Sequence, residues 1–224
     1  MRNYFKYLKD LPKTIYFNFK TLPFFMALRL PFYVSHKYKI DLPPRKECLK
    51  IISISKDATR FSIRFGNGGS IDVIPNNYGL IHFLAGSSVV FGCDVQFAAG
   101  CSLRVDGGTF RIGNHFSANR NCEISCTDGI EIGNNVLCAF RVGIRDSDGH
   151  TVVNKGTPQI THERIVIGDH VWICGDVDIL KGVCIGTDSV VAFRSLVLKG
   201  KYESHTVLGG IPAKALKTNM DWKL

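Results

Sequence analysis

Apolar side chains recur at every sixth position in one long stretch of the chain. The period is unbroken from residue 167 to residue 197, and the position four residues after each apolar site is small or β-branched. No helix repeats at six residues, whereas a short strand followed by a turn can do so. The pattern therefore predicts hexads that each place one aliphatic side chain inside. These side chains are Ile167, Ile173, Ile179, Ile185, Val191 and Val197.

Three hexads form one larger unit, because IGDHVW at 167–172 returns as IGTDSV at 185–190, eighteen residues later. This spacing predicts a triangular coil of three short faces, with turns in which Gly, Asn or Asp tolerates a positive φ. Stacked coils would pair their backbone groups with the coils above and below. We therefore expect an all-β parallel solenoid. A sandwich of two antiparallel sheets is the alternative, but it does not require so strict a phase.

The repeat extends toward the N-terminus in weaker form. It is present from Ile112 to Ile130, restarts two residues out of phase at Ile132, and has echoes as early as Val89. The solenoid is expected over roughly residues 70 to 200, within a domain of residues 48–201. Residues 1–47 contain five prolines and predict short helices and an extended linker, and residues 202–224 predict a return strand and a short helix. Both terminal segments could cap the solenoid.

The net charge of +9 indicates an anionic partner. Basic residues mix with aromatic ones before residue 47, and no nucleic-acid module follows, so we expect a membrane-surface or subunit-packing segment and no nucleic acid. No run of about eighteen uncharged apolar residues is present, and MRNYFKYLKD lacks the pattern of a secretory leader. The expected location is the cytoplasm, with peripheral association at the cytoplasmic face of the inner membrane.

Neither the cysteines nor the histidines have the spacing of a metal site. The eight cysteines are scattered through repeat positions that need small apolar side chains, and no C-x-x-C pair occurs. They are expected to be reduced thiols in the core. A zinc-dependent carbonic anhydrase, a class that shares this kind of solenoid, needs two histidines five residues apart, and none of the seven histidines meets that requirement. No metal is expected.

The stretch IGDHVWICGDVDILKGVCIGTDSVVAFRSLVLKG, followed by GGIPAK, resembles the bacterial hexapeptide-repeat acyltransferases. DSDGH at 146–150 resembles their sugar O-acetyltransferase branch, which acts on units of capsule, lipopolysaccharide or exopolysaccharide. The resemblance implies a left-handed parallel β-helix, a homotrimer with active sites between neighbouring solenoids, and acetyl-CoA as acyl donor. It also implies a sugar or glycan acceptor.

His150 lies at the position of the catalytic histidine in this resemblance, and its surroundings support the same role. It follows two aspartates and a glycine, and it precedes the excursion 151–164, which interrupts the repeat. Such a loop would place the imidazole in a cleft, where it could take the proton of an acceptor hydroxyl. Asp146 or Asp148 could hold the ring tautomer. A surface histidine in an Asp-Gly turn is the alternative.

The resemblance also implies positions for the other site residues. Asn119 and Asp128 would contact the acceptor, and Trp172 would form a wall of the cleft toward both acceptor and cofactor. The remaining cofactor-binding candidates are Gly175 and Phe193 along the pantetheine, and Lys199, Lys214 and Lys217 near the nucleotide. The chain departs from the family pattern where Cys174 replaces a glycine and where Phe193 and Arg194 replace two small residues, and these changes could narrow the pantetheine channel.

Together these features predict an acetyl-CoA-dependent O-acetyltransferase that acetylates a sugar hydroxyl by direct transfer. Two alternatives stay open. An N-acyltransferase of an amino sugar or sugar nucleotide could use the same histidine, because an amine must also lose a proton before attack. A non-enzymatic solenoid scaffold would explain the repeat and the caps, but not DSDGH, the excursion and GGIPAK together.

Overall fold

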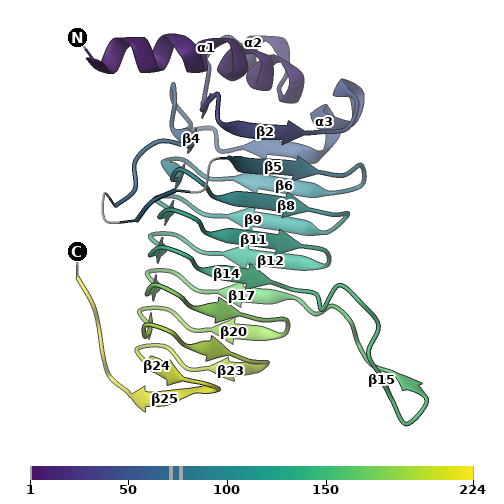
Figure 1. Cartoon of the computed structure of the whole chain (residues 1–224), viewed down its shortest axis with the longest axis vertical. Coiled ribbons are helices and arrows are strands. Elements are labelled where there is room, and N and C mark those ends of the chain that lie inside the picture. Colours follow the sequence, from purple (N-terminus) through teal and green to yellow (C-terminus); the bar gives the residue numbers. More distant parts are fainter. Residues whose placement is uncertain (1, 71–72, 76–77, 224) are drawn as a thin grey trace.

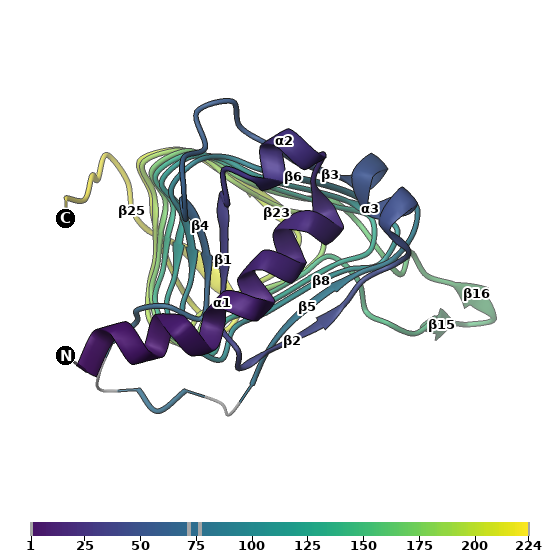
Figure 2. The same cartoon turned by 90° about the horizontal axis from the view of Figure 1, so that it is seen from above.

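Three parallel sheets wrap around one axis and form a triangular prism (Figures 1 and 2). The computed structural model describes residues 2–70, 73–75 and 78–223, with side chains from Leu8 onward in these ranges. Each coil contributes one strand to each sheet, and each strand pairs in parallel with the strands of the coils before and after it. The predicted parallel solenoid is confirmed.

The three walls are named sheets A, B and C. Sheet A contains, in spatial order, β1 (Phe32–Val34), β4 (Ile63–Phe65), β7 (Val95–Phe97), β10 (Ser117–Ala118), β13 (Leu137–Cys138), β18 (Trp172–Ile173), β21 (Val190–Val191), β24 (Val207–Gly210) and β25 (Ala213–Lys217). Sheet B contains β2 (Tyr38–Asp41), β5 (Gly79–Phe83), β8 (Ser102–Val105), β11 (Glu123–Cys126), β14 (Gly143–Arg145), β19 (Asp178–Ile179) and β22 (Leu196–Val197). Sheet C contains β3 (Ile52–Ile54), β6 (Ser88–Phe91), β9 (Thr109–Ile112), β12 (Gly129–Ile132), β17 (Ile165–Ile167), β20 (Val183–Ile185) and β23 (Gly200–Tyr202).

The periodic aliphatic side chains fill the interior of the prism. Ile167, Ile173 and Ile179 are at most 1% exposed, as the hexad pattern predicts. The apparent change of phase near residue 131 arises within one strand, because Ile130 and Ile132 both lie in β12 and both point inward. The interior is therefore continuous where the sequence pattern seems to restart.

The solenoid is longer than the sequence predicts at both ends. Its first strand begins at Phe32, before the expected boundary at residue 48, and its last coil reaches Gly210, beyond residue 201. The early coils were missed because phenylalanines replace the aliphatic residues inside. Phe65 and Phe97, for example, stack with ring centroids 4.9 Å apart. Helix α3 (Arg45–Ile51) also interrupts the six-residue spacing.

Helix α1 (Arg2–Thr21) lies across the N-terminal end of the prism, followed by α2 (Phe24–Ala27) (Figure 2). Two buried polar side chains of α1 pair with the outer edge of β1. Thr14 Oγ1 accepts from Val34 N–H at 3.0 Å, and Asn18 Oδ1 accepts from Phe32 N–H at 3.1 Å. Because an unpaired buried amide is costly, the helix replaces the missing coil as a cap.

The C-terminal segment closes the opposite end. β25 returns antiparallel to β24, as predicted for a return strand. The short helix expected in the same segment is absent from residues 202–223, where the chain instead continues as an extended tail along the corner between sheets C and A. Within the described ranges, no helix is long and apolar enough to cross a membrane.

Candidate active site

The DSDGH segment leaves the prism at the end of β14, at the corner between sheets B and C. There the chain enters the excursion, which carries the antiparallel hairpin of β15 (Val153–Asn154) and β16 (Thr157–Pro158) and projects away from the prism (Figure 1). The His150 side chain is exposed, and no other described residue gives it a hydrogen bond or an ion pair. It lines a hollow of about 550 Å³ together with Arg104, Arg145 and Asp148. The imidazole therefore faces open space beside the outer face of sheet B.

Asp146 is not positioned to orient His150. Its side chain is fully buried, and its two carboxylate oxygens accept backbone N–H donors from Thr127, Asp128 and Gly129 at 2.7–2.8 Å. A carboxylate that accepts three such bonds holds the turn at residues 127–129, in the preceding coil, in place. Of the two aspartates proposed to fix the ring tautomer, the structure thus gives this one a structural role.

Asp148 lies in the loop itself, close to His150 in sequence. Its carboxylate forms an ion pair with Lys181, and its backbone N–H donates to the carbonyl of Thr161 at 2.8 Å. Both contacts tie the start of the excursion to its end and to the following coil. Asp148 makes no hydrogen bond to the imidazole in this structure, and its contacts fix the loop that presents His150.

The two acceptor-binding candidates lie at different corners. Asn119 is at the corner between sheets A and B, and its Oδ1 accepts from the backbone N–H groups of Ser70 and Arg120, both at 2.8 Å. Asp128 is exposed at the corner between sheets B and C, the corner from which the excursion starts. Neither is brought into contact with His150 within one chain.

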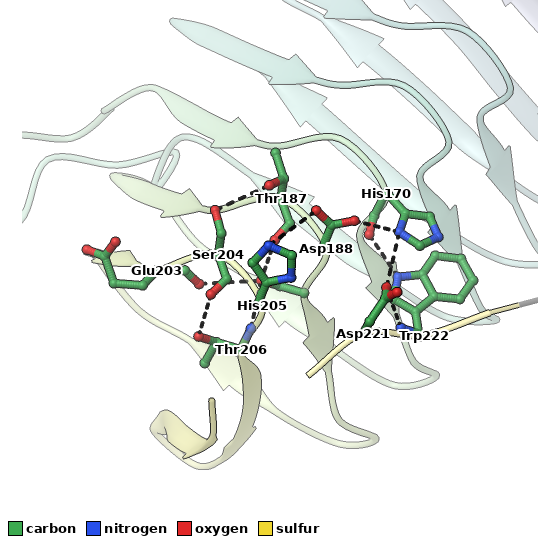
Figure 3. Close-up of polar contacts among 10 residues, drawn as sticks. His170, Thr187, Asp188, Glu203, Ser204, His205, Thr206, Asp221 and Trp222 are labelled. Carbon is green, nitrogen blue, oxygen red and sulfur yellow. Dashed lines mark hydrogen bonds and ion pairs between the residues drawn. The ribbon is translucent and has the colours of Figure 1, made fainter. Parts of the chain in front are cut away.

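Trp172 lies on sheet A, on the other side of the prism from the hollow beside sheet B. Its side chain is 36% exposed and packs against Trp222 of the C-terminal tail, with ring centroids 5.9 Å apart. Figure 3 shows how this tail is held: Trp222 stacks on His170, and its Nε1–H donates to the His170 carbonyl at 2.8 Å. The indole of Trp172 covers the outside of the prism, as expected.

Histidine and aspartate side chains from successive coils meet beside this tail. His170 Nδ1 lies 2.8 Å from Asp188 and 3.7 Å from Asp221, and His205 Nε2 lies 3.7 Å from Asp188 (Figure 3). The hydrogen bond to His170 is the main reason that the pKa of Asp188 lies below its ordinary value. The cluster holds the tail against the corner between sheets C and A.

Gly175 and Phe193 lie next to each other at the corner between sheets A and B. A Cβ at Gly175 would lie 2.7 Å from the ring of Phe140 and 2.9 Å from that of Phe193, so a larger residue would require one of these rings to shift. Phe193 is 51% exposed and points out of the prism, where it packs edge-on against Phe140 at 6.2 Å. This aromatic pair occupies the place where the sequence departs from the family pattern. Beside it, burial raises the pKa of the Cys174 thiol, as for a packing residue.

The three candidate lysines are on other sides of the molecule. Lys199 lies at the corner between sheets B and C and pairs with Glu163 at 2.7 Å, whereas Lys214 and Lys217 are exposed on β25, at the edge of sheet A. A single chain therefore does not assemble the predicted cofactor residues around His150. All eight cysteines are free. Four are buried in the prism, in agreement with reduced core thiols, and Cys48 is buried on α3.

Sequence reasoning missed two arginines that line the hollow beside His150. Arg104 and Arg145 both lie opposite Ser125 in the register of sheet B, so all three side chains share one outward column. The spacings of 21 and 20 residues between them differ from the eighteen of the regular repeat. Counting the residues in each coil of this region would have placed Arg104 and Arg145 in the same column, one coil before and one coil after Ser125.

No profile of a known protein family matches the chain. A protein of Escherichia coli K12 assigned to lipopolysaccharide biosynthesis as an O-acetyl transferase, WbbJ, is 32% identical over 143 residues, or 58% of this chain and 71% of that protein. The galactoside O-acetyltransferase of the same organism is 34% identical over 113 residues, or 50% of this chain and 55% of that protein. The chain thus spans little more than half the length of this second relative.

Among solved structures, the polySia-specific acetyltransferase NeuO superposes with a TM-score of 0.60 at 21% identity. The match covers 86% of this chain and 71% of that one. At this level of identity the superposition concerns the fold. The shared fold is the left-handed parallel β-helix, which confirms the handedness that the resemblance implied.

Proposed function

Because the chain belongs to the hexapeptide-repeat acetyltransferases, we propose that it transfers the acetyl group of acetyl-CoA to a sugar hydroxyl during surface-polysaccharide synthesis. The observation that carries this proposal is the exposed imidazole of His150, which has no partner among the described residues and stands beside a hollow on sheet B. The two relatives described above are named for O-acetylation in lipopolysaccharide synthesis and of galactosides. A hydroxyl acceptor is therefore favoured over an amine.

The proposed mechanism is a direct transfer with His150 as general base. The imidazole takes the proton of the acceptor hydroxyl while the oxygen attacks the thioester carbonyl carbon. A backbone N–H stabilises the oxyanion of the tetrahedral intermediate, the carbon–sulfur bond then breaks, and the CoA sulfur receives the proton from His150. Lys181 and Asp148 act as positioning residues, because their ion pair holds the loop that presents the imidazole. The mechanism requires no metal ion.

The complete site is proposed to form between neighbouring copies of the chain in a homotrimer. His150 lies beside sheet B, whereas Trp172 lies on sheet A and Phe193 at the corner between sheets A and B. If one copy supplies the base and the next supplies the pantetheine wall, candidate residues that lie on different faces of one chain would meet in one cleft. Lys199, Lys214 and Lys217 would then meet the phosphates of the cofactor, and Asn119 and Asp128 would reach the acceptor from the two sides of the cleft.

We also propose that the enzyme works in the cytoplasm and associates with the inner face of the membrane. Large apolar side chains are exposed on α1, on α2 and directly after α2, among them Leu8 at 62%, Phe25 at 82% and Leu28 at 52%. Basic residues interleave with them, which favours an anionic surface. Flotation with anionic liposomes tests this, since Phe25→Ser with Leu28→Ser should reduce recovery in the lipid fraction. Unchanged recovery would contradict membrane association through this face.

The transferase is tested by thiol release from acetyl-CoA with a panel of simple sugars and glycan extracts. His150→Ala should lower acceptor-dependent release by roughly 10²–10⁴-fold, the usual contribution of general acid–base catalysis. His162→Ala is the matched control, because this second histidine is also exposed in the excursion and should retain activity. Equal release by the parent and His150→Ala would remove this base from the mechanism. Activity that requires a free amine on the acceptor would instead favour the N-acyltransferase.

A further inference from the structure

A continuous groove runs along the outer face of sheet B, starting at His150. Three adjoining hollows compose it, and each shares lining residues with the next. Arg145 lines all three, Arg104 lines the two nearer His150, and Glu123 lines the two farther from it. The groove crosses β8, β11, β14 and β19, so it extends over more surface than the single acceptor position beside the base.

The guanidinium of Arg145 is the feature of this groove that the proposed mechanism does not use. Its side chain is exposed, and no described residue forms a hydrogen bond or an ion pair with it. The other arginines that line the groove have carboxylate partners, since Arg104 pairs with Asp106 and Arg141 pairs with Asp176. Among the arginines of the groove, Arg145 is therefore the one without an ion-pair partner in the described ranges.

Two carboxylates line the hollow farthest from His150, next to Arg145. Glu123 and Asp178 are exposed, and neither has an ion-pair partner in the described ranges. Carboxylate oxygens accept hydrogen bonds from sugar hydroxyls, and they repel a second carboxylate. A ligand with one anionic group would thus be held in one register, with its anion at Arg145 and its hydroxyl-bearing part over Glu123 and Asp178.

We propose that this groove binds an acidic glycan chain, one that carries a sugar carboxylate. The carboxylate pairs with the Arg145 guanidinium, in the bidentate geometry that arginine favours, and thereby brings a neighbouring hydroxyl to His150. The net charge of +9 favours the same class of ligand by attracting anions to the protein. This inference rests on the proposed function for the reaction, but the binding step can be measured without acetyl-CoA.

The test compares short oligomers of neutral sugars that carry a single galacturonate or glucuronate residue with the same oligomers after reduction of that carboxyl group, using calorimetry on the full chain. The acidic oligomers should bind at least about tenfold more tightly than the reduced ones. Arg145→Gln should abolish this difference. Arg60→Gln removes the same charge from an exposed arginine outside the groove and should preserve it. Equal binding of acidic and reduced oligomers, an unaffected Arg145→Gln variant, or no binding of either acidic oligomer at millimolar concentration would each overturn the inference.

The two proposals fail in different ways. Arg145-dependent binding without thiol release from any acceptor would leave the acidic-glycan groove in place and contradict the transferase. Thiol release that depends on His150 but is indifferent to the acceptor's carboxyl group would preserve the transferase and contradict the groove's assignment. If both proposals are correct, the KM for acidic oligomers should be at least about tenfold higher in Arg145→Gln than in the parent. This difference should become smaller at high salt, because salt screens the exposed ion pair between Arg145 and the sugar carboxylate.

Discussion

The indole of Trp222 stacks on the imidazole of His170 with ring centroids 4.4 Å apart and an interplanar angle of 12°. Through this contact, two residues that are 52 positions apart in the sequence place the C-terminal tail against Trp172. The backbone N–H of Met220 continues the attachment by donating to the His205 carbonyl at 2.9 Å. Trp222 itself is only 8% exposed, so the stacking buries nearly the whole indole.

Replacing this indole should release the tail while the prism stays folded. Trp222→Ala removes both the stacking and the Nε1–H hydrogen bond, so the Met220 amide should exchange its hydrogen at least about tenfold faster. The exchange rates of amides in sheet A should not change. Trp222→Phe keeps an aromatic ring and should exchange at an intermediate rate. An unchanged Met220 amide in Trp222→Ala would mean that the backbone bonds alone hold the tail.

The carboxylate of Asp146 should matter for stability, because it accepts three backbone N–H bonds. Asp146→Ala leaves these donors unpaired and should lower the free energy of unfolding by roughly 3 kcal/mol. That loss corresponds to a fall in Tm of roughly 6–12 °C for a chain of this size. Asp148→Ala, which removes an exposed ion pair, should shift Tm by less than about 4 °C. Equal Tm values for the two variants would contradict the structural role of Asp146.

The N-terminal cap should weaken in acid through Asp10. Burial favours the neutral form of this carboxyl, but the hydrogen bonds from His36 and Tyr33 outweigh burial and place its pKa below the ordinary value of 3.8. Its ionised form therefore stabilises the fold above pH 3.8, and this contribution is lost as pH falls through the lower pKa of the folded state. The difference in Tm between the parent and Asp10→Asn should be largest near neutral pH and should shrink below pH 4. A difference that stays constant from pH 7 to pH 3 would contradict this linkage.

The stacked rings in the N-terminal coils should be more sensitive to truncation than the outward positions beside them. Phe97→Ala leaves a cavity next to Phe65 and should cost roughly 3–5 kcal/mol. Gln96→Ala changes a side chain on the outer face of the same strand and should cost less than about 1 kcal/mol. Chemical denaturation of the two variants measures the difference. Similar midpoints would indicate that the coil repacks around the missing ring.

The regular part of the solenoid could be predicted from the sequence because each hexad contributes the same local geometry. From Ile167 to Val197 an interior side chain recurs at every sixth position without insertions, so the six-residue spacing alone predicts the fold. The coils before Phe97 could not be counted in this way, since phenylalanine rings replace the aliphatic side chains and α3 separates their strands. Periodicity measures spacing along the chain and does not register which residues pack across the prism.

The candidate site was predictable in part for the same reason. The position of His150 follows from where the repeat breaks, and the structure places it outside the prism on the excursion. The choice between Asp146 and Asp148 depends on which carboxylate turns inward at a corner, and the DSDGH pattern does not specify this. Arg145 was missed because its importance comes from neighbours one and two coils away, which only the register of sheet B brings together.

The antiparallel direction of β25 has a consequence for polymerisation. All other strand pairs in sheet A are parallel, so a coil of a second molecule would need to add in parallel at the free edge of β24. β25 already occupies that edge, and at the opposite end Thr14 and Asn18 of α1 occupy the edge of β1. Both ends of the parallel stack in sheet A are therefore covered, which removes the edges at which a coil of a second molecule could pair in parallel. In this sheet, an architecture that could otherwise elongate coil by coil is closed to parallel addition.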